Sequence, residues 1–179
     1  MGKQYSKISE KLKEFIETQK IFFIATAAPD GRVNLSPKGM DSLRVVNANR
    51  IIWLNHTGSG NETAAHLAES PRMTVMFCSF EDEPKILRLY GVAREVQPGD
   101  KEWDTLYQQF PPLKGARQIF DMSVDLVQTS CGFAVPFFTY QGEREMLKEW
   151  AEKKGEEGIK NYWREKNSVS LDGKSIKTP

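Results

Sequence analysis

A set of small, polar and basic side chains follows the ends of several apolar runs, and these residues have the clearest chemical potential. Lysine and hydroxyl groups beside the start of a helix suit a phosphate, while flat apolar side chains suit an aromatic ring. The combination predicts a site for a phosphate-bearing aromatic ligand. The polar members are Lys38, Arg44, Ser59, Asn61, Thr63 and Arg88, and the apolar residues interleaved with them are Met40, Trp53 and Leu54.

The central segment, residues 57–67, has the sequence TGSGNETAAHL and lies between two apolar runs. Its glycines predict a turn, and Ser59 with Glu62 fits the Ser-x-x-Glu capping box of a helix start. The free N–H groups and the dipole of a helix start favour an anion. The alternative is a capped helix that binds nothing. Lys38 also fits a solvated surface position, and Trp53 also fits a place in the core.

Composition excludes several classes of function. The chain has 179 residues, with 25 Lys plus Arg against 24 Asp plus Glu, and this balance argues against a nucleic-acid surface. No apolar run approaches the roughly 18 residues of a membrane span. The two cysteines and two histidines form no metal-binding motif, and no histidine stands in an evident catalytic triad. Reduced cysteines and a polar N-terminus predict a cytoplasmic location.

The elements that would position the candidate residues are mostly short strands. Branched, aromatic and alternating residues predict strands near 21–27, 32–36, 43–46, 50–54, 73–80, 85–96 and 123–127. Apolar residues at helical spacing predict helices at 6–18, after residue 59, from Asp100 as N-cap to residue 110, and at 144–154 and 159–166. So many short strands with so few helices between them favour an antiparallel barrel or sandwich.

Two segments are expected to depart from regular structure. Ser36-Pro37-Lys38-Gly39 is predicted to interrupt the second strand, because proline lacks an N–H donor. The polar tail, residues 169–179, is predicted to be loosely ordered. We divide the chain into a β-rich domain, residues 1–140, which the resemblance described next implies to be a split barrel, and a C-terminal helical extension, residues 141–179, that packs on the same domain.

The sequence also resembles a known family. Residues 22–27, the run DGRVNLSPKG at 30–39, Trp53-Leu54 and residues 57–63 look like the pyridoxamine 5'-phosphate oxidase-related flavoproteins, with a resemblance over about residues 8–135. The resemblance implies a mainly β fold with peripheral helices, namely a six-stranded antiparallel split β-barrel. It also implies a homodimer with FMN bound at the subunit interface.

The resemblance assigns candidate cofactor contacts. Lys38-Gly39-Met40 corresponds to the start of a strand that runs along the flavin, Trp53-Leu54 to a Tyr-Thr pair, and Gln118 to a glutamine of the second subunit. A phosphate-binding Ser-Arg-Lys triplet corresponds to Asn61-Glu62-Thr63, so an acid and a hydroxyl replace two cations. The candidate cofactor-binding residues are Lys38, Gly39, Met40, Trp53, Leu54, Ser59, Asn61, Thr63 and Gln118, and no metal ligand or catalytic acid or base is assigned.

Different kinds of function follow from this resemblance. The first is an FMN-dependent oxidoreductase that acts on a small molecule, in which the flavin exchanges hydride. The second is a non-enzymatic split barrel that carries flavin or haem as a sensor or store. A haem carrier would need an axial ligand, and His56 and His66 are the two histidines. A deazaflavin-dependent reductase is a third reading. No nucleic-acid or membrane partner is expected, and the substrate stays open.

Overall fold

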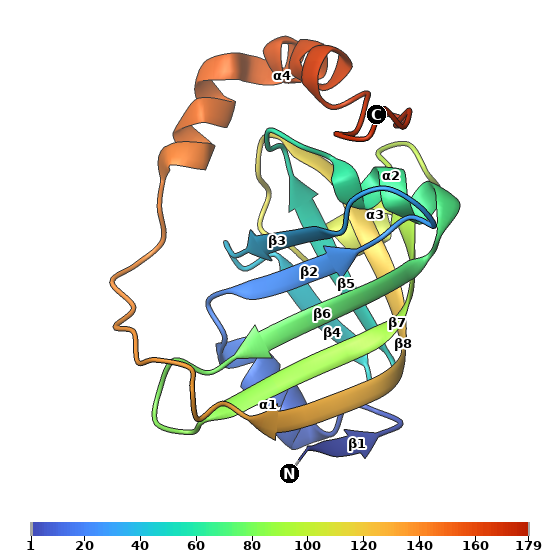
Figure 1. Ribbon diagram of the computed structural model, residues 1–179. Coiled ribbons are helices and arrows are strands. Elements are labelled where there is room, and N and C mark those ends of the chain that lie inside the picture. The colour runs from blue at the N-terminus through green and yellow to red at the C-terminus, as the bar shows by residue number, and fades with distance from the viewer. Residues whose placement is uncertain (1, 179) are drawn as a thin grey trace.

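Residues 2–178 are described by a computed structural model, in which one curved antiparallel sheet organises the chain (Figure 1). The eight strands follow the order β3-β2-β6-β7-β8-β5-β4, with β1 paired to β8 off this path. The elements are β1 (Lys3–Tyr5), α1 (Glu10–Thr18), β2 (Phe22–Thr26), β3 (Asn34–Lys38), β4 (Leu43–Asn47), β5 (Arg50–His56), α2 (Glu62–Glu69), β6 (Arg72–Cys78), β7 (Lys85–Val96), α3 (Trp103–Tyr107), β8 (Ala116–Cys131) and α4 (Met146–Lys166).

The predicted mainly β, antiparallel split-barrel fold is confirmed, with eight strands in place of six. The short strand β1 has three residues, all exposed, so it carries no apolar alternation that a sequence pattern could reveal. By contrast, β8 has 16 residues and extends well beyond the predicted 123–127, because it pairs with β5 along one side and with β7 along the other.

The edge strand β3 carries the first candidate site residue. It pairs with β2 and places Lys38 opposite Phe22 at its end. The strand continues through Pro37, so the predicted interruption of this strand is wrong. Proline is tolerated because β3 lies at an edge of the sheet, where one side of the strand makes no ladder hydrogen bonds.

The main core lies inside the curved sheet. At its centre Trp53 of β5 stacks on Phe120 of β8, with 4.8 Å between the ring centroids. Neighbouring residues of a strand point to opposite faces, so Leu54 belongs to a second cluster between the sheet and α3. That cluster consists of Ile52, Leu54, Val96, Leu106, Phe110 and Ile119.

The helices α1 and α3 both begin later than the sequence pattern predicts. The first begins at Glu10 instead of residue 6, because Ser9 caps it by accepting a hydrogen bond from the N–H of Leu12. The third begins at Trp103, and Asp100 is not its cap. The Asp100 carboxylate instead accepts from the N–H of Gln97 at 2.7 Å, which closes the turn before the helix.

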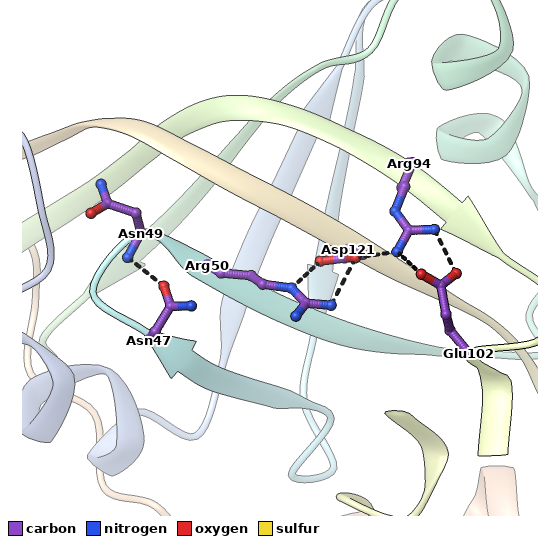
Figure 2. Close-up of polar contacts among 6 residues, drawn as sticks. All are labelled: Asn47, Asn49, Arg50, Arg94, Glu102 and Asp121. Atoms are coloured by element: carbon purple, nitrogen blue, oxygen red, sulfur yellow. Dashed lines mark hydrogen bonds and ion pairs between the residues drawn. The ribbon is translucent and has the colours of Figure 1, made fainter. Parts of the chain in front are cut away.

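A charged cluster fastens the loop before α3 to the sheet (Figure 2). Asp121 of β8 accepts from Arg50 at 2.8 Å and from Arg94 at 2.7 Å, and Arg94 also donates to Glu102. Burial alone would raise the pKa of Asp121, but the hydrogen bonds and charges of the two arginines outweigh burial and lower it. These four residues therefore form a structural ion cluster.

The C-terminal part of the chain returns to the end of the sheet that carries α2 (Figure 1). Residues 132–145 contain no helix or strand and lead to α4. The helix breaks at Gly155, whose φ of 66° and ψ of 173° are not helical. The break falls at this residue because glycine adopts a positive φ at low cost. The two halves of α4 correspond to the two predicted helices.

The tail beyond α4 is fixed to the loop between β2 and β3 and to α2, so the prediction of loose order is wrong for its described residues. Lys174 Nζ donates to Asp30 and to Glu69, each at 2.8 Å, and Asp172 accepts from Arg32. Ile176 is 8% exposed and joins the main core. These contacts come from distant segments, so the polar composition of the tail does not reveal them.

Several large apolar side chains stay exposed on the protein. Leu35 on β3 is 63% exposed, and in the segment before α4 Phe133 is 83% and Phe137 is 75% exposed.

Within residues 2–178, no helix has both the length and the apolar character that crossing a membrane requires.

Candidate functional site

A hollow of about 280 Å³ opens where β3, β5, β8 and the start of α2 meet, and we call it the α2 hollow. Polar side chains dominate its lining, and the charged members are the cations Lys38 and Arg117 and the carboxylate of Glu62. Four predicted cofactor residues line it together, namely Lys38, Ser59, Asn61 and Thr63. Asn55, His56 and Arg117 line it as well, and none of these three is a predicted cofactor residue.

The other predicted cofactor residues lie elsewhere. Gly39 lines a separate hollow beside α1, and Met40 sits in the turn between β3 and β4 with a left-handed φ of 62°. Trp53 and Leu54 are 3% and 1% exposed in the two core clusters, so their side chains offer little surface to a ligand. Gln118 is fully buried next to the hollow, where its Nε2 donates to Asn61 Oδ1 at 3.2 Å.

The start of α2 differs from the predicted capping box. The helix begins at Glu62, and Asn61 is its N-cap residue without a side-chain cap bond. Glu62 Oε1 accepts from the backbone N–H of Leu171, so this carboxylate binds the C-terminal segment. The predicted Ser59 and Glu62 box is therefore wrong, while the helix start itself does border the hollow.

Asn61 holds a hydrogen-bond donor without a partner. The residue is 3% exposed, and its Oδ1 is occupied by Gln118. Its Nδ2 is buried and has no partner in the described part of the chain. Leaving a buried donor unpaired costs about 1–3 kcal/mol, so a ligand that accepts from Nδ2 would recover this energy.

His56 lines the same hollow with both ring nitrogens buried and, within residues 2–178, unpaired. Burial, with a further contribution from the charge of Lys38, lowers the pKa of His56 to about 4. The imidazole is therefore neutral near pH 7. A neutral imidazole has one donor and one acceptor nitrogen, so it is able to donate one hydrogen bond to a ligand.

Lys38 brings a cation to the hollow from the end of β3. Its Nζ lies 5.0 Å from the centroid of the Trp53 ring, a cation–π arrangement. Burial lowers the pKa of Lys38 to about 8, with a further contribution from the charge of Arg117. The ammonium form is thus present at neutral pH, but no negatively charged side chain forms an ion pair with it among the described residues.

Arg117 brings a second cation from the start of β8 and is 1% exposed. It donates to Gln118 Oε1 at 2.7 Å, to the Gly60 carbonyl at 3.0 Å and to the side-chain oxygen of Asn167. All three acceptors are neutral, and these bonds do not use every N–H donor of a guanidinium. Burial lowers the pKa of Arg117 to about 10, and the charge of Glu95 opposes this only in part.

Neither cation has an anionic partner. In the part of the chain that the structure describes, no ion pair involves Lys38 or Arg117. Buried charges are usually paired, because removal from water is costly. Two unpaired cations, an unpaired amide donor and a helix start therefore make the α2 hollow chemically suited to an anion such as a phosphate.

Comparisons with known proteins agree with the fold and identify the family. The family model described as pyridoxamine 5'-phosphate oxidase matches residues 8–131. A relative from Aspergillus flavus, the pyridoxamine 5'-phosphate oxidase family protein ustO, is 33% identical over 189 residues, covering 94% of this chain and 75% of the relative.

Solved structures show the same fold at low sequence identity. HupZ from Group A Streptococcus aligns with a TM-score of 0.53 at 18% identity, covering 66% of this chain and 91% of HupZ. A candidate pyridoxamine 5'-phosphate oxidase from Lactobacillus delbrueckii aligns with a TM-score of 0.55 at 13% identity, covering 69% of this chain and 94% of that protein. From the family match and the fungal relative, the chain belongs to the pyridoxamine 5'-phosphate oxidase family.

Proposed function

We propose that this protein binds FMN, with the flavin phosphate in the α2 hollow, and acts as an oxidoreductase on a small molecule. The observation that carries the proposal is the presence of two unpaired cations in one hollow, namely the half-buried Lys38 and the buried Arg117. A phosphate between them would offset the cost of burying both charges.

The other groups of the hollow fit the same ligand. Asn61 Nδ2 is a buried donor without a partner among the described residues, and the N–H groups at the start of α2 favour negative charge. The family's phosphate triplet loses its two cations at Asn61-Glu62-Thr63. Lys38 and Arg117 supply two cations from other strands, so the chemical requirement is met in a different way.

Once bound, a flavin would supply hydride exchange, and the protein would supply binding and orientation. Lys38 and Arg117 would hold the phosphate by charge, and Asn61 would fix its orientation by a hydrogen bond. The charge of Lys38 depends on pH because its pKa is about 8. The geometry of the hollow supports the cofactor class and leaves the substrate open.

We also propose that the protein forms a homodimer in the cytoplasm, with the flavin at the subunit interface. The exposed side chains of Leu35, Phe133 and Phe137 support a partner surface. Covering large apolar groups with a second copy of the chain removes them from water, which is favourable. Cys78 and Cys131 are both free thiols, which supports a reducing compartment. Light scattering would test the dimer directly.

The experiment that tests the function is a visible absorbance spectrum of protein purified without added cofactor. Flavin bands, with FMN released on denaturation, would support the proposal. A Soret band would instead favour haem carriage, with His56 as the ligand to test. A protein that binds neither FMN nor riboflavin when they are added would contradict flavin binding.

A further inference from the structure

We infer that Asn167, at the end of α4, positions the anion site by holding Arg117 and the loop before α2 in place. This inference rests on the proposed function of the α2 hollow as a phosphate site. Asn167 lies outside residues 8–131, the part of the chain that matches the family model. The C-terminal extension would therefore complete a site whose other residues belong to the split barrel.

Asn167 contacts both sides of the site. The residue has no exposed surface, and its side-chain oxygen accepts from Arg117 Nη1. Its Nδ2 donates to the carbonyl of Gly58 at 3.1 Å and, more weakly, to that of Ser59 at 3.4 Å. A single amide therefore links the cation of β8 to the loop that leads into α2.

A second contact fixes the helix that carries Asn167. Trp163 Nε1 donates to Thr57 Oγ1 at 2.7 Å, and that hydroxyl donates in turn to the carbonyl of Gly115 at 2.7 Å. Thr57 begins the loop before α2, and Gly115 precedes β8. The extension is thus bonded to the loop here as well, close to both segments that supply the hollow.

The loop needs such a restraint because of its composition. Gly58 and Gly60 have open space around them, since a Cβ added at either position would meet nothing within 4 Å. Glycines without packing contacts have many accessible conformations, and ordering them is entropically costly. The Asn167 amide donates to the carbonyl oxygens of Gly58 and Ser59. These partly negative oxygens therefore face the amide.

The choice of an amide at this position preserves the charge of Arg117. Asparagine accepts the hydrogen bond of the guanidinium but remains neutral. An aspartate of the same size would form an ion pair with Arg117 and cancel the charge that an anion would bind. Asn167→Asp is therefore a substitution of similar volume that separates the electrostatic role of the residue from its packing role.

The test is a fluorescence titration of the full chain with FMN and with riboflavin, which lacks the phosphate. We expect Asn167→Ala to weaken FMN binding about 10-fold or more, the range for a hydrogen bond to a charged group, and to change riboflavin binding by less than about 2-fold. Asn167→Asp should weaken FMN binding further than Asn167→Ala. Asn161→Ala is the matched control, because this asparagine of the same helix is exposed and bonds only Arg164 among the described residues.

The possible outcomes distinguish the positioning role of Asn167 from the phosphate site itself. If wild-type protein prefers FMN over riboflavin and the Asn167 variants keep that preference, the positioning role is overturned while the phosphate site stands. If both ligands weaken equally, together with a lower melting temperature, Asn167 only supports the fold. If the wild-type protein shows no preference for FMN, the phosphate site is overturned, and the inference with it.

Discussion

Lys38 of β3 and Arg117 of β8 line the same hollow, and the charge of Arg117 adds to burial in lowering the pKa of Lys38 to about 8. The two cations thus disfavour each other in the ligand-free protein. An anion placed between them reverses this relation, because it attracts both charges. The testable consequences concern ligand affinity, pH dependence and stability.

Removing the Lys38 charge should weaken FMN binding. We expect Lys38→Met to cost about 1.5–3 kcal/mol of binding free energy, the range for a hydrogen bond to a charged group. Riboflavin affinity should change much less, because riboflavin has no phosphate. Fluorescence titration measures both, and an FMN affinity equal to that of the wild type would contradict the assignment of Lys38.

FMN binding should also weaken with rising pH. Because the pKa of Lys38 is about 8 in the free protein, its ammonium form is lost as the pH rises from about 7 to about 9. A bound phosphate favours the ammonium form, so binding is accompanied by proton uptake in this interval. Titrations across the interval should show a decline for the wild type, and a flat profile for Lys38→Met. A decline of equal size in both proteins would assign it to another group.

The same lysine should destabilise the ligand-free fold. Its pKa is lowered from 10.5 to about 8, so between these values the unfolded chain binds more protons than the folded protein. The penalty is therefore complete below about pH 8 and disappears as the pH rises towards 10.5. At pH 7 we expect Lys38→Met to increase the free energy of unfolding by about 1–3 kcal/mol. Urea unfolding measures this change, and a less stable variant would argue against a burial penalty.

His56 should make the protein sensitive to acid. Burial and the charge of Lys38 lower the pKa of His56 from 6.5 to about 4, so the unfolded chain binds more protons between these two values. The stability that neutral His56 provides is present above about pH 6.5 and is lost as the pH falls towards 4. Glutamine does not titrate, so in His56→Gln we expect the acid-induced decrease in the free energy of unfolding to be smaller by up to about 3 kcal/mol. Urea unfolding at several pH values would reveal the difference, and parallel curves for the two proteins would contradict it.

Gly91 should be essential for the pairing of β7 with β8. A Cβ at this position would lie 1.9 Å from the carbonyl oxygen of Ser123, beside the register shift between Tyr90 and Gly91. We expect Gly91→Ala to lower the free energy of unfolding by about 3 kcal/mol or more, because the backbone must move. Gly58→Ala is the control, since a Cβ there meets nothing within 4 Å. Equal stability of the two variants would contradict this reading.

Much of the strand pattern was predictable, because alternation and turn residues are local signals. The pair Trp53-Leu54 was wrongly expected to line one site, and strand alternation explains why. Neighbouring strand residues point to opposite faces, so the two side chains enter different core clusters and cannot line one site together. The helix start at Glu62 was misplaced because the preceding loop is held by Asn167, which is distant in sequence.

Arg117 shows why a site residue was missed. It stands directly before the predicted Gln118, yet nothing local marks it as buried. Its burial arises from bonds to Gly60 and Asn167, which are 57 and 50 residues away along the chain. The position of Arg117 at the start of β8, directly before Gln118, was the available signal, and its meaning depends on contacts that only the fold provides.

The most direct test of the central claim is the ratio of FMN to riboflavin affinity in the wild-type protein near pH 7. These two ligands differ only in the phosphate, so the ratio reports the contribution of the α2 hollow. We expect FMN to bind at least about 10-fold more tightly, as a charge-assisted contact provides. Equal affinities would contradict a phosphate site formed by Lys38 and Arg117.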